Sequence, residues 1–366
     1  MNTKTPLDTA CSVCLAPGDS VNHLDHLAVI AYILDIPLVT DEELLVETMA
    51  TYYPQVKALY IQKHAQILEF LATRYDALFV SSANYRKDLS PLLEILFRKQ
   101  LQFWYCPHGN SDKPMKQFGM QETTLIYGNQ MEERLKQADI LPTLKGYVKT
   151  GNYRLSFYQK YASFYDGLVE KEVFSHFKKR QTTLLYAPTW HDLESSSSLF
   201  EVGKLLLNSL PDHYNLIVKL HPWLDHHHSG IVHLLKEQYG DKPNIVILTL
   251  YPLVLPILNR TDAYLGDFSS IGYDFLFFNR PMFFFDPKTR KDKTCAESSY
   301  VHSCGQVMTE KDYPHIYDRI TRGMANPSSF KAAQKRLYRY AFGEPRSFSS
   351  LKGEIQAQIA ALKKDQ

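Results

Sequence analysis

The residues best suited to chemistry in this sequence stand directly after short apolar runs that predict β-strands. Five such runs are followed by polar, glycine- or proline-containing segments: Pro107–Asn110, Gly151–Arg154, Pro188–Trp190, His221–Trp223 and Gly266–Gly272. In open α/β sheets, ligands bind beyond the carboxyl ends of the strands. The repetition of this pattern at five strand ends therefore predicts one ligand site more strongly than any single motif does.

The segment after Ala263–Leu265 has the composition of a phosphate site. Asp267, Ser269 and Ser270 precede a helix that is predicted to begin near Ile271. Hydroxyl groups and free N–H groups at the start of a helix bind anions, and the helix dipole assists them. Ser and Asp also serve as simple N-caps, but two serines, an Asp and a Gly are more than a cap needs. Asp274, one turn after Ser270, is placed to orient these hydroxyls or to contact a ribose.

Two histidines at strand ends are candidates for catalysis. His221 is expected to donate to a phosphate oxygen, provided that a partner fixes its tautomer. His108 is expected to act as a general base towards an acceptor hydroxyl, because an imidazole titrates near neutral pH. Gly109 would let a ligand approach the backbone. The alternatives are that His221 is a structural histidine and that His108 caps its own loop.

Asp25 and His26 form a second candidate group on the same side, where the first predicted helix, His26–Leu34, begins. They follow a Gly18-Asp19-Ser20 loop, so Asp25 is either an N-cap or a residue of the acceptor site.

Three other segments are expected to carry no chemistry. The run His226-His227-His228 lacks ligands from other segments and is expected to be a solvated loop, so we predict no metal site. Ser195–Ser198 is expected to be a flexible loop. Cys11 and Cys14 form a CxxC without a second pair, which argues against zinc; small residues of a strand are the expected role and redox chemistry is the alternative.

The elements that must position these residues alternate between strand and helix, which predicts two α/β domains with parallel sheets around a cleft. The predicted strands are Cys11–Ala16, Ile36–Thr40, Ala58–Ile61, Ala77–Ser81, Gln102–Cys106, Thr124–Tyr127, Tyr147–Thr150, Thr183–Ala187, Tyr214–Leu220, Ile245–Leu248, Ala263–Leu265 and Met282–Phe285. The rhythm breaks over 156–181. The expected domains are therefore 1–165 and 180–327, with 328–366 as C-terminal helices that cross back to the first domain.

Composition excludes some classes of function. Of the 366 residues, 45% are hydrophobic and 22% are charged, and the net charge is +2, which argues against a nucleic-acid-binding protein. Neither a signal peptide nor a membrane span is expected. Five cysteines, an odd number, favour a reduced, cytoplasmic protein. The basic segment 328–364 is expected to be a solvated helix face, with peripheral contact to the inner face of the cytoplasmic membrane as the alternative.

Several of these segments together resemble the CDP-glycerol glycerophosphotransferases, which include the teichoic acid primases and polymerases. The resemblance lies in Tyr186–Trp190, Lys219–Pro222, Asp267–Ser270 with Asp274, Arg280-Pro281, Phe285–Pro287, His108-Gly109, and Thr150–Asn152 with Arg154. It is close over Thr182–Pro287 and looser over Phe103–Arg154.

The resemblance implies a GT-B fold: two Rossmann-like domains with parallel sheets that face a central cleft. It also implies transfer of glycerol phosphate, or a similar polyol phosphate, from a CDP-linked donor to an acceptor hydroxyl, with release of CMP, in cell-envelope polymer synthesis. The expected acceptor is a polyol or glycan, including a lipid-linked one, and neither cofactor nor metal is expected.

By the same resemblance, His108 matches the base and His221 matches a residue that holds the donor pyrophosphate. The implied donor-binding residues are Thr189, Trp190, His221, Asp267, Ser269, Ser270 and Asp274. The expected acceptor-side residues are Asp25, His26, Gly109, Asn152 and Arg154. Two alternative functions remain: a GT-B glycosyltransferase or epimerase that uses a nucleotide-sugar, and a non-catalytic relative that binds a nucleotide or a glycan.

Overall fold

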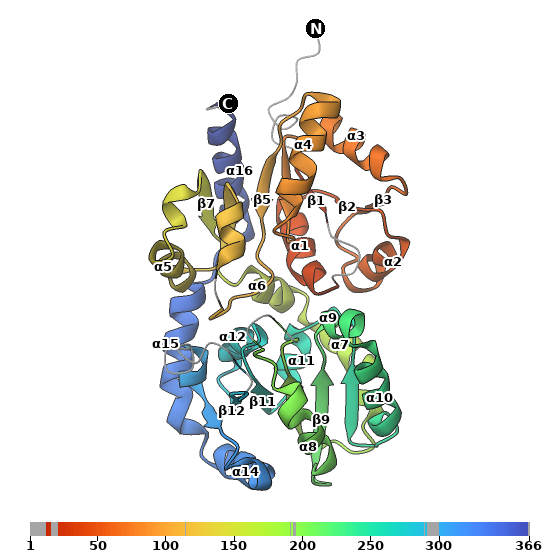
Figure 1. The fold of residues 1–366 in the computed structure, drawn as a ribbon, viewed down its shortest axis with the longest axis vertical. Coiled ribbons are helices and arrows are strands. Elements are labelled where there is room, and N and C mark those ends of the chain that lie inside the picture. Colours follow the sequence, from red (N-terminus) through yellow and green to blue (C-terminus); the bar gives the residue numbers. More distant parts are fainter. Residues whose placement is uncertain are drawn as a thin grey trace. The chain divides into compact units, whose positions relative to one another are not determined.

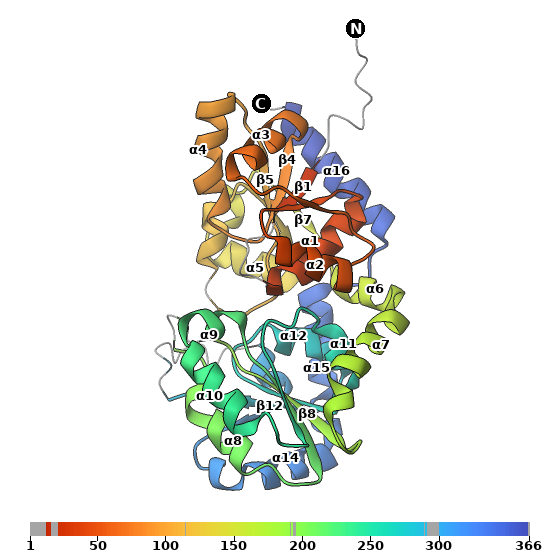
Figure 2. The same ribbon diagram turned by 90° about the vertical axis from the view of Figure 1, so that its right-hand side faces the viewer.

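The computed structural model describes residues 12–15, 21–113, 115–190, 192, 195–288, 290 and 300–364. It divides into two compact units, unit 1 (1–108, 114–159 and 340–366) and unit 2 (109–113 and 160–339). Helices cover both faces of the sheet in each unit (Figures 1 and 2). Cys11 of the CxxC and the loop 18–20 lie outside the described residues.

Unit 1 contains a seven-stranded parallel sheet in the order β3-β2-β1-β4-β5-β6-β7. Its strands are β1 (Ser12–Leu15), β2 (Leu38–Thr40), β3 (Ala58–Tyr60), β4 (Ala77–Val80), β5 (Gln102–Tyr105), β6 (Thr123–Ile126) and β7 (Gly146–Lys149). Every residue of β4 and β5 is buried, as continuous apolar strands in a sheet covered on both faces should be. The order reverses between β1 and β4, and such a reversal is where ligands bind in this class of fold.

The helices of unit 1 connect these strands. They are α1 (Val21–Leu34), α2 (Glu43–Tyr52), α3 (His64–Arg74), α4 (Tyr85–Phe97), α5 (Asn129–Gln137), α6 (Tyr153–Lys160) and α16 (Phe348–Lys364), with short 3-10 turns η2 (Lys116–Met120) and η3 (Leu141–Thr143). The first helix begins at Val21 rather than at the predicted His26, because the polar residues of 21–26 continue the helical turn. Asp25 is therefore inside the helix and is not its N-cap.

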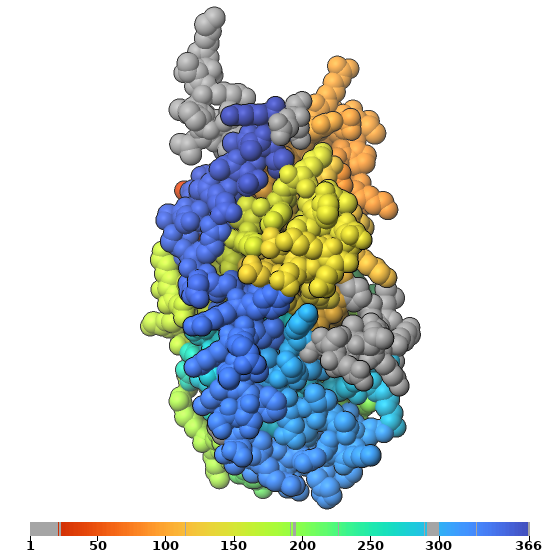
Figure 3. Space-filling view, turned by 90° about the vertical axis from the view of Figure 1, so that its left-hand side faces the viewer, coloured from red at the N-terminus to blue at the C-terminus, as the bar shows by residue number. Residues whose placement is uncertain are grey.

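The last helix, α16, completes unit 1 although it comes from the end of the chain. Leu351, Ile355 and Ile359 recur every fourth residue and are buried as one stripe. Gln102 on β5 donates its side-chain amide to the carbonyl of Ile359 at 3.0 Å. In Figure 3 the dark blue helix lies against the yellow segment that ends in β7, which it contacts.

Unit 2 contains a six-stranded parallel sheet in the order β10-β9-β8-β11-β12-β13. Its strands are β8 (Thr182–Ala187), β9 (Tyr214–Lys219), β10 (Ile245–Leu248), β11 (Ala263–Gly266), β12 (Met282–Phe285) and β13 (Gln306–Met308). Leu184, Leu216 and Phe285 lie in one buried cluster at its centre. Here the reversal falls between β8 and β11, so the segments after these two strands lie at the position where ligands bind.

The helices of unit 2 cover both faces of this sheet. They are α7 (Ala162–Glu172), α8 (Lys204–Asn208), α9 (Pro222–His227), α10 (Ser229–Tyr239), α11 (Leu255–Arg260), α12 (Ile271–Phe275), α14 (Ile316–Ala325) and α15 (Lys331–Phe342), whose last turn belongs to unit 1. Shorter turns are η4 (Phe174–His176), η5 (Leu199–Gly203, π-helical), η6 (Leu276–Phe278), η7 (Val301–Cys304), η8 (Tyr313–His315) and η9 (Pro327–Phe330). In the described part of the chain, no helix combines the length and the apolar character needed to cross a membrane.

The division differs from the predicted boundaries in three places, one of which is that 109–113 belongs to unit 2. Unit 1 gives way to unit 2 at 159/160, at the last residue of α6, rather than at 165. The C-terminal segment 328–366 is shared, since residues up to Arg339 belong to unit 2 and those from Tyr340 belong to unit 1.

Candidate functional site

The predicted donor residues of unit 2 gather at the carboxyl ends of β8, β9 and β11. We call Pro188–Trp190, His221 and Asp267–Ser270 the strand-end site. Asp267 holds two of its loops together, because one carboxylate oxygen accepts from the Thr189 N–H at 2.9 Å. The other oxygen accepts from the N–H of Ser198 at 2.7 Å and from its hydroxyl at 2.8 Å. The carboxylate of Asp267 is fully buried, so it positions the loops instead of lining a ligand pocket as the resemblance implied.

Burial raises the pKa of Asp267 to about 6, although the hydrogen bonds from Ser198 and Thr189 oppose this rise. Water is excluded from the carboxylate, so its charge is stabilised only by these donors and by the more distant Lys113 ammonium. The charge of Asp267 thus depends on the loops that it holds.

The serine run of unit 2 is a buried part of this site and not the flexible loop that its composition predicts. Ser196, Ser197 and Ser198 are all buried. Ser197 donates its hydroxyl to the carbonyl of Thr189 at 2.7 Å. Ser196 donates its N–H at 2.7 Å, and also its hydroxyl, to Asp192. Their small hydroxyls satisfy buried acceptors, a role that a run of serines does not reveal in sequence.

His221 caps helix α9 and has a defined tautomer. Its Nδ1 accepts from the Trp223 N–H at 3.2 Å, in the position of an N-cap side chain. A ring nitrogen that accepts carries no proton, so the neutral imidazole holds its proton on Nε2. The imidazole of His221 is therefore set up as a donor through Nε2.

An aromatic group surrounds His221. The ring of Trp190 lies 6.3 Å from that of His221 and 5.3 Å from that of Trp223. His227 stacks on Trp223 at 4.9 Å. His226 and His227 are thus the last residues of α9, and His228 joins α9 to α10. The run does not form the predicted loop, and His227 belongs to an aromatic stack.

Ser269 and Ser270 precede the short helix α12, as predicted. The Ile271 N–H donates to the Ser269 hydroxyl at 3.5 Å, and the Asp274 N–H donates to the Ser270 carbonyl at 3.4 Å. Ser270 is the N-cap but its side chain makes no capping bond. Both serines are half-buried, whereas Asp274 is buried. Their hydroxyls are consistent with the predicted anion site, and α12 is too short to add much dipole.

The segment Gly109–Lys113, which we call the inserted segment, belongs to unit 2 although both of its neighbours in sequence belong to unit 1. Gly109 has φ +137°, and a Cβ at this position would lie 2.5 Å from the Cβ of Ser270. The glycine is therefore needed for close packing on Ser270, whereas the sequence suggested an approach by a ligand.

Two charged side chains fasten the inserted segment. The carboxylate of Asp112 accepts from the Tyr273 hydroxyl and from the Val301 N–H. Lys113 donates to Asp192 at 2.6 Å and to the Thr189 hydroxyl at 3.0 Å. Burial alone would raise the pKa of Asp192, but the charge of Lys113 and hydrogen bonds from Lys113 and Ser196 hold it below its usual value. These contacts could not be predicted from the sequence, because residues that are far apart along the chain come together only when the chain folds.

The predicted residues of unit 1 form two adjoining groups. In the first, the exposed His108 ring lies 4.6 Å from the ring of His23. Buried His26 shares a hydrogen bond of 2.9 Å with the Tyr127 hydroxyl, which itself donates to the Pro107 carbonyl. Burial lowers the pKa of His26 well below its usual value, and the charges of Arg154, His108 and His23 lower it further. His26 is therefore neutral and donates through Nδ1.

The second group is a buried ion pair. Arg154 on α6 binds the carboxylate of Asp25 on α1 through Nε, at 3.0 Å, and through a terminal nitrogen. The Tyr53 hydroxyl donates to the same carboxylate at 3.0 Å. Asp25 and Arg154 thus join two helices inside unit 1, a role that neither of the two readings of Asp25 included.

Asn152 also has a local structural partner. Its Oδ1 accepts from the Leu155 N–H at 3.2 Å at the start of α6, while its buried Nδ2 has no partner among the described residues. In this part of the chain no group of His, Cys, Asp and Glu is arranged to hold a metal ion.

Part of the chain matches a known protein family. Residues 170–294 match the family model described as CDP-glycerol:poly(glycerophosphate) glycerophosphotransferase. No curated protein matches the sequence.

Three solved structures are similar over nearly the whole chain. The wall teichoic acid polymerase TagF has a TM-score of 0.68 and 13% identity, covering 99% of this chain and 91% of that one. The UDP-GlcNAc 2-epimerase from Neisseria meningitidis has a TM-score of 0.57 and 11% identity, covering 97% and 100%. MnaA from S. aureus has a TM-score of 0.59 and 11% identity, covering 97% of both chains. These likenesses show that the fold is GT-B.

The matched segment runs from α7 to just beyond β12 and contains every residue of the strand-end site. This segment, set in a GT-B fold, is thus similar to the CDP-glycerol glycerophosphotransferase family.

Proposed function

We propose that this chain transfers glycerol phosphate, or a similar polyol phosphate, from CDP-glycerol or a related CDP-alcohol to an acceptor hydroxyl and releases CMP, in cell-envelope polymer synthesis. The observation that carries the proposal is the position of His221, Ser269 and Ser270. They follow β9 and β11, the two strands that flank β8, inside the matched segment 170–294. A TagF structure obtained after soaking with CDPG supports the choice of donor.

The proposed reaction is an in-line displacement at the phosphorus of the glycerol phosphate. The acceptor oxygen forms a bond to phosphorus, its proton passes to His108, and the bond from phosphorus to the CMP oxygen breaks. Charge that develops on the departing CMP requires donors that are already oriented. The Nε2–H of His221 and the hydroxyls of Ser269 and Ser270 are proposed to supply them.

The other predicted residues are proposed to act by contact with the donor or by positioning. Thr189 and Trp190 are proposed to border the donor, and Asp274 to contact its ribose or orient the serine hydroxyls. Asp267 is proposed to fix the loops that carry these groups.

The residues of unit 1 are proposed to serve the acceptor. Asp25, His26, Asn152 and Arg154 are proposed to shape the surroundings of the acceptor. Gly109, which belongs to unit 2, is proposed to keep the inserted segment close to Ser270. The acceptor is proposed to be a polyol or glycan hydroxyl, lipid-linked or in a polymer.

The reaction is proposed to take place in the cytoplasm, where free thiols such as those of buried Cys106 and Cys304 persist. Basic residues of α15 are proposed to assist peripheral contact with the membrane when the acceptor is lipid-linked.

The test is CMP release from CDP-glycerol by the purified protein, with His108→Ala and His221→Ala. Removal of a general base lowers the rate by about 10²–10⁴-fold, and removal of an oriented donor by about 10²–10³-fold. His221→Asn is the matched control for folding, since its side-chain oxygen can still accept from Trp223. Full activity in His108→Ala would reject the base assignment.

A thermal-shift comparison of nucleotides tests the donor directly, because a ligand that binds the folded state raises the melting temperature. Stabilisation by CMP and CDP-glycerol supports the proposal. Stabilisation by uridine nucleotides alone would instead favour a nucleotide-sugar enzyme.

A further inference from the structure

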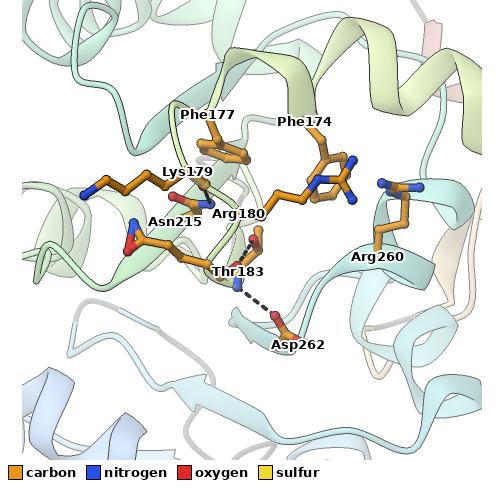
Figure 4. Close-up of a pocket in the computed structure, with 9 residues that line it drawn as sticks. Phe174, Phe177, Lys179, Arg180, Thr183, Asn215, Arg260 and Asp262 are labelled. Carbon is orange, nitrogen blue, oxygen red and sulfur yellow. Dashed lines mark hydrogen bonds between the residues drawn. The ribbon is translucent and has the colours of Figure 1, made fainter.

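A cavity of ≈ 270 Å³ lies at the amino ends of β8 and β9, and charged groups in its wall are held by the fold itself (Figure 4). Asp262 accepts from the Thr183 N–H at 2.8 Å. Arg260 pairs with Glu170 on α7. The Lys179 side chain points away from Arg260, so these two cations do not converge on one ligand. We therefore assign no ligand to this cavity.

Two buried histidines of helix α1, His23 and His26, contact the segment that carries the proposed base, His108. They are 7% and 3% exposed. They stand three residues apart, so they lie on the same face of the helix. A buried polar side chain lowers stability unless it is bound by other groups. The contacts of these two imidazoles therefore indicate what they do.

His26 acts on the backbone directly before His108. Its Nδ1 donates to the Tyr127 hydroxyl at 2.9 Å, and this hydroxyl donates to the Pro107 carbonyl, also at 2.9 Å. Burial lowers the pKa of His26 well below its usual value, and the charges of Arg154 and His108 lower it further. His26 therefore stays neutral when His108 gains a proton, and its Nδ1–H remains bound to Tyr127.

His23 acts on the side chain of His108. The centres of the two rings are 4.6 Å apart, and their planes are tilted by 42°. Contacts between aromatic rings favour a small set of mutual orientations. His108 is thus held at two points, because the Pro107 carbonyl fixes its backbone and the ring of His23 restricts its imidazole.

We propose that His23, His26 and Tyr127 are positioning residues, which hold His108 in the orientation that lets it take the proton of the acceptor hydroxyl. The inference rests on the proposed function, in which His108 is the base. A general base acts only within hydrogen-bond reach of the proton that it removes. A displacement of about 1 Å can lower a rate about 100-fold, so the attachment of the base contributes directly to the rate.

The positioning can be measured without turnover, by NMR of the full-length protein labelled at its histidine rings. A nuclear Overhauser effect between the rings of His23 and His108 is expected in the wild type, since their centres are 4.6 Å apart. His108→Gln identifies the signals of His108. Tyr127→Phe keeps the ring but releases the Pro107 carbonyl, so the effect is expected to be lost. An effect of equal strength in Tyr127→Phe, or none in the wild type, would overturn the proposal.

The rate of CMP release then separates positioning from donor binding. Tyr127→Phe is expected to lower kcat about tenfold or more and to leave KM for CDP-glycerol unchanged, because the strand-end site is not altered. Tyr147→Phe is the matched control, since it removes a hydroxyl of β7 that donates to Glu132 at 2.7 Å in the same unit. Equal kcat values in the two variants would overturn the role of Tyr127.

Two substitutions at His23 test the ring contact. His23→Ala removes it and is expected to lower kcat about 2- to 10-fold, the rate equivalent of an aromatic pair. His23→Phe keeps a ring and is expected to restore most of kcat, with the melting temperature of each variant measured alongside. A kcat in His23→Phe as low as in His23→Ala would overturn the contact. Absence of CMP release in the wild type would count against the proposed function, while the NMR comparison still decides the positioning.

Discussion

Single buried carboxylates organise both candidate sites. Asp267 receives three hydrogen bonds from two loops of unit 2, and Asp25 receives bonds from Arg154 and Tyr53 in unit 1. Each carboxylate exchanges its hydrating water for hydrogen-bond donors at fixed positions. The stability of its charged form therefore depends on where these donors lie. The contribution of each carboxylate to the stability of the protein can be measured by substituting it with an uncharged residue.

Asp267 should make stability depend on pH between about 4 and 6. Its pKa rises from the ordinary 3.8 to about 6 on folding, so in this range the folded protein keeps a proton that the unfolded chain has released. Stability from this group therefore falls as the pH rises through the range, by on the order of 3 kcal/mol in total. Urea unfolding of wild type and Asp267→Asn should give a difference that shrinks from pH 4 to pH 7. A constant difference would contradict the raised pKa.

Removal of only one partner of the ion pair between Asp25 and Arg154 should strongly lower the stability of the protein. Asp25→Ala leaves a guanidinium that is 3% exposed without its carboxylate, and such a change costs about 3–5 kcal/mol. The double variant Asp25→Ala with Arg154→Met should be less destabilised than the sum of the single variants, because it leaves no buried charge. Thermal unfolding of the four proteins measures this coupling. Additive effects would show that the two residues act independently.

At the scale of elements, the inserted segment packs on the start of α12 within unit 2. Gly109→Ala should destabilise unit 2 by about 1–3 kcal/mol and lower CMP release, because φ +137° is strained for alanine and its Cβ would meet Ser270. Gly353→Ala, in the open middle of α16, is the control and should be neutral or stabilise by up to about 1 kcal/mol. Equal effects of the two changes on activity would argue against a special role for Gly109.

The strands could be predicted because their signal is local. Runs such as Leu216–Val218 and Met282–Phe285 are apolar throughout, and both lie in buried parallel strands. The family and its GT-B fold followed from motifs at the ends of such strands. By contrast, β13 was not predicted, since a three-residue strand is too short to give a periodic signal. Helix α14 was also not predicted, although Ile316, Tyr317 and Ile320 recur at helical spacing and form its buried face.

The environment of the candidate site could not be predicted in the same way. Ser196–Ser198 have the composition of a linker, and only the folded chain gives them their partners, which are the buried carboxylates of Asp192 and Asp267 and the Thr189 carbonyl. Lys113 is separated from Asp192 by 79 residues. Contacts at such separations depend on tertiary packing, which local propensity does not encode.

At the scale of the whole molecule, unit 1 is built from both ends of the chain. Its sheet is made before residue 150, but α16 supplies Leu351, Ile355 and Ile359 to its interior. Unit 1 thus needs the C-terminus, whereas unit 2 is nearly continuous in sequence.

Removal of residues 348–366 should therefore affect one unit selectively. The exposed apolar surface left on unit 1 should increase hydrogen exchange in β5 and β7, while β8 and β9 keep their protection. Hydrogen exchange with mass spectrometry on the truncated protein measures both. Loss of protection in β8 and β9 to the same extent would show that the units unfold together.

The same arrangement sets an order of events during synthesis on the ribosome. The first 159 residues emerge early, yet they lack the helix that completes their interior until the last 19 residues have been made. Unit 2 can fold while the sheet of unit 1 still lacks α16. The nascent chain of unit 1 would then be the part that most needs protection by chaperones.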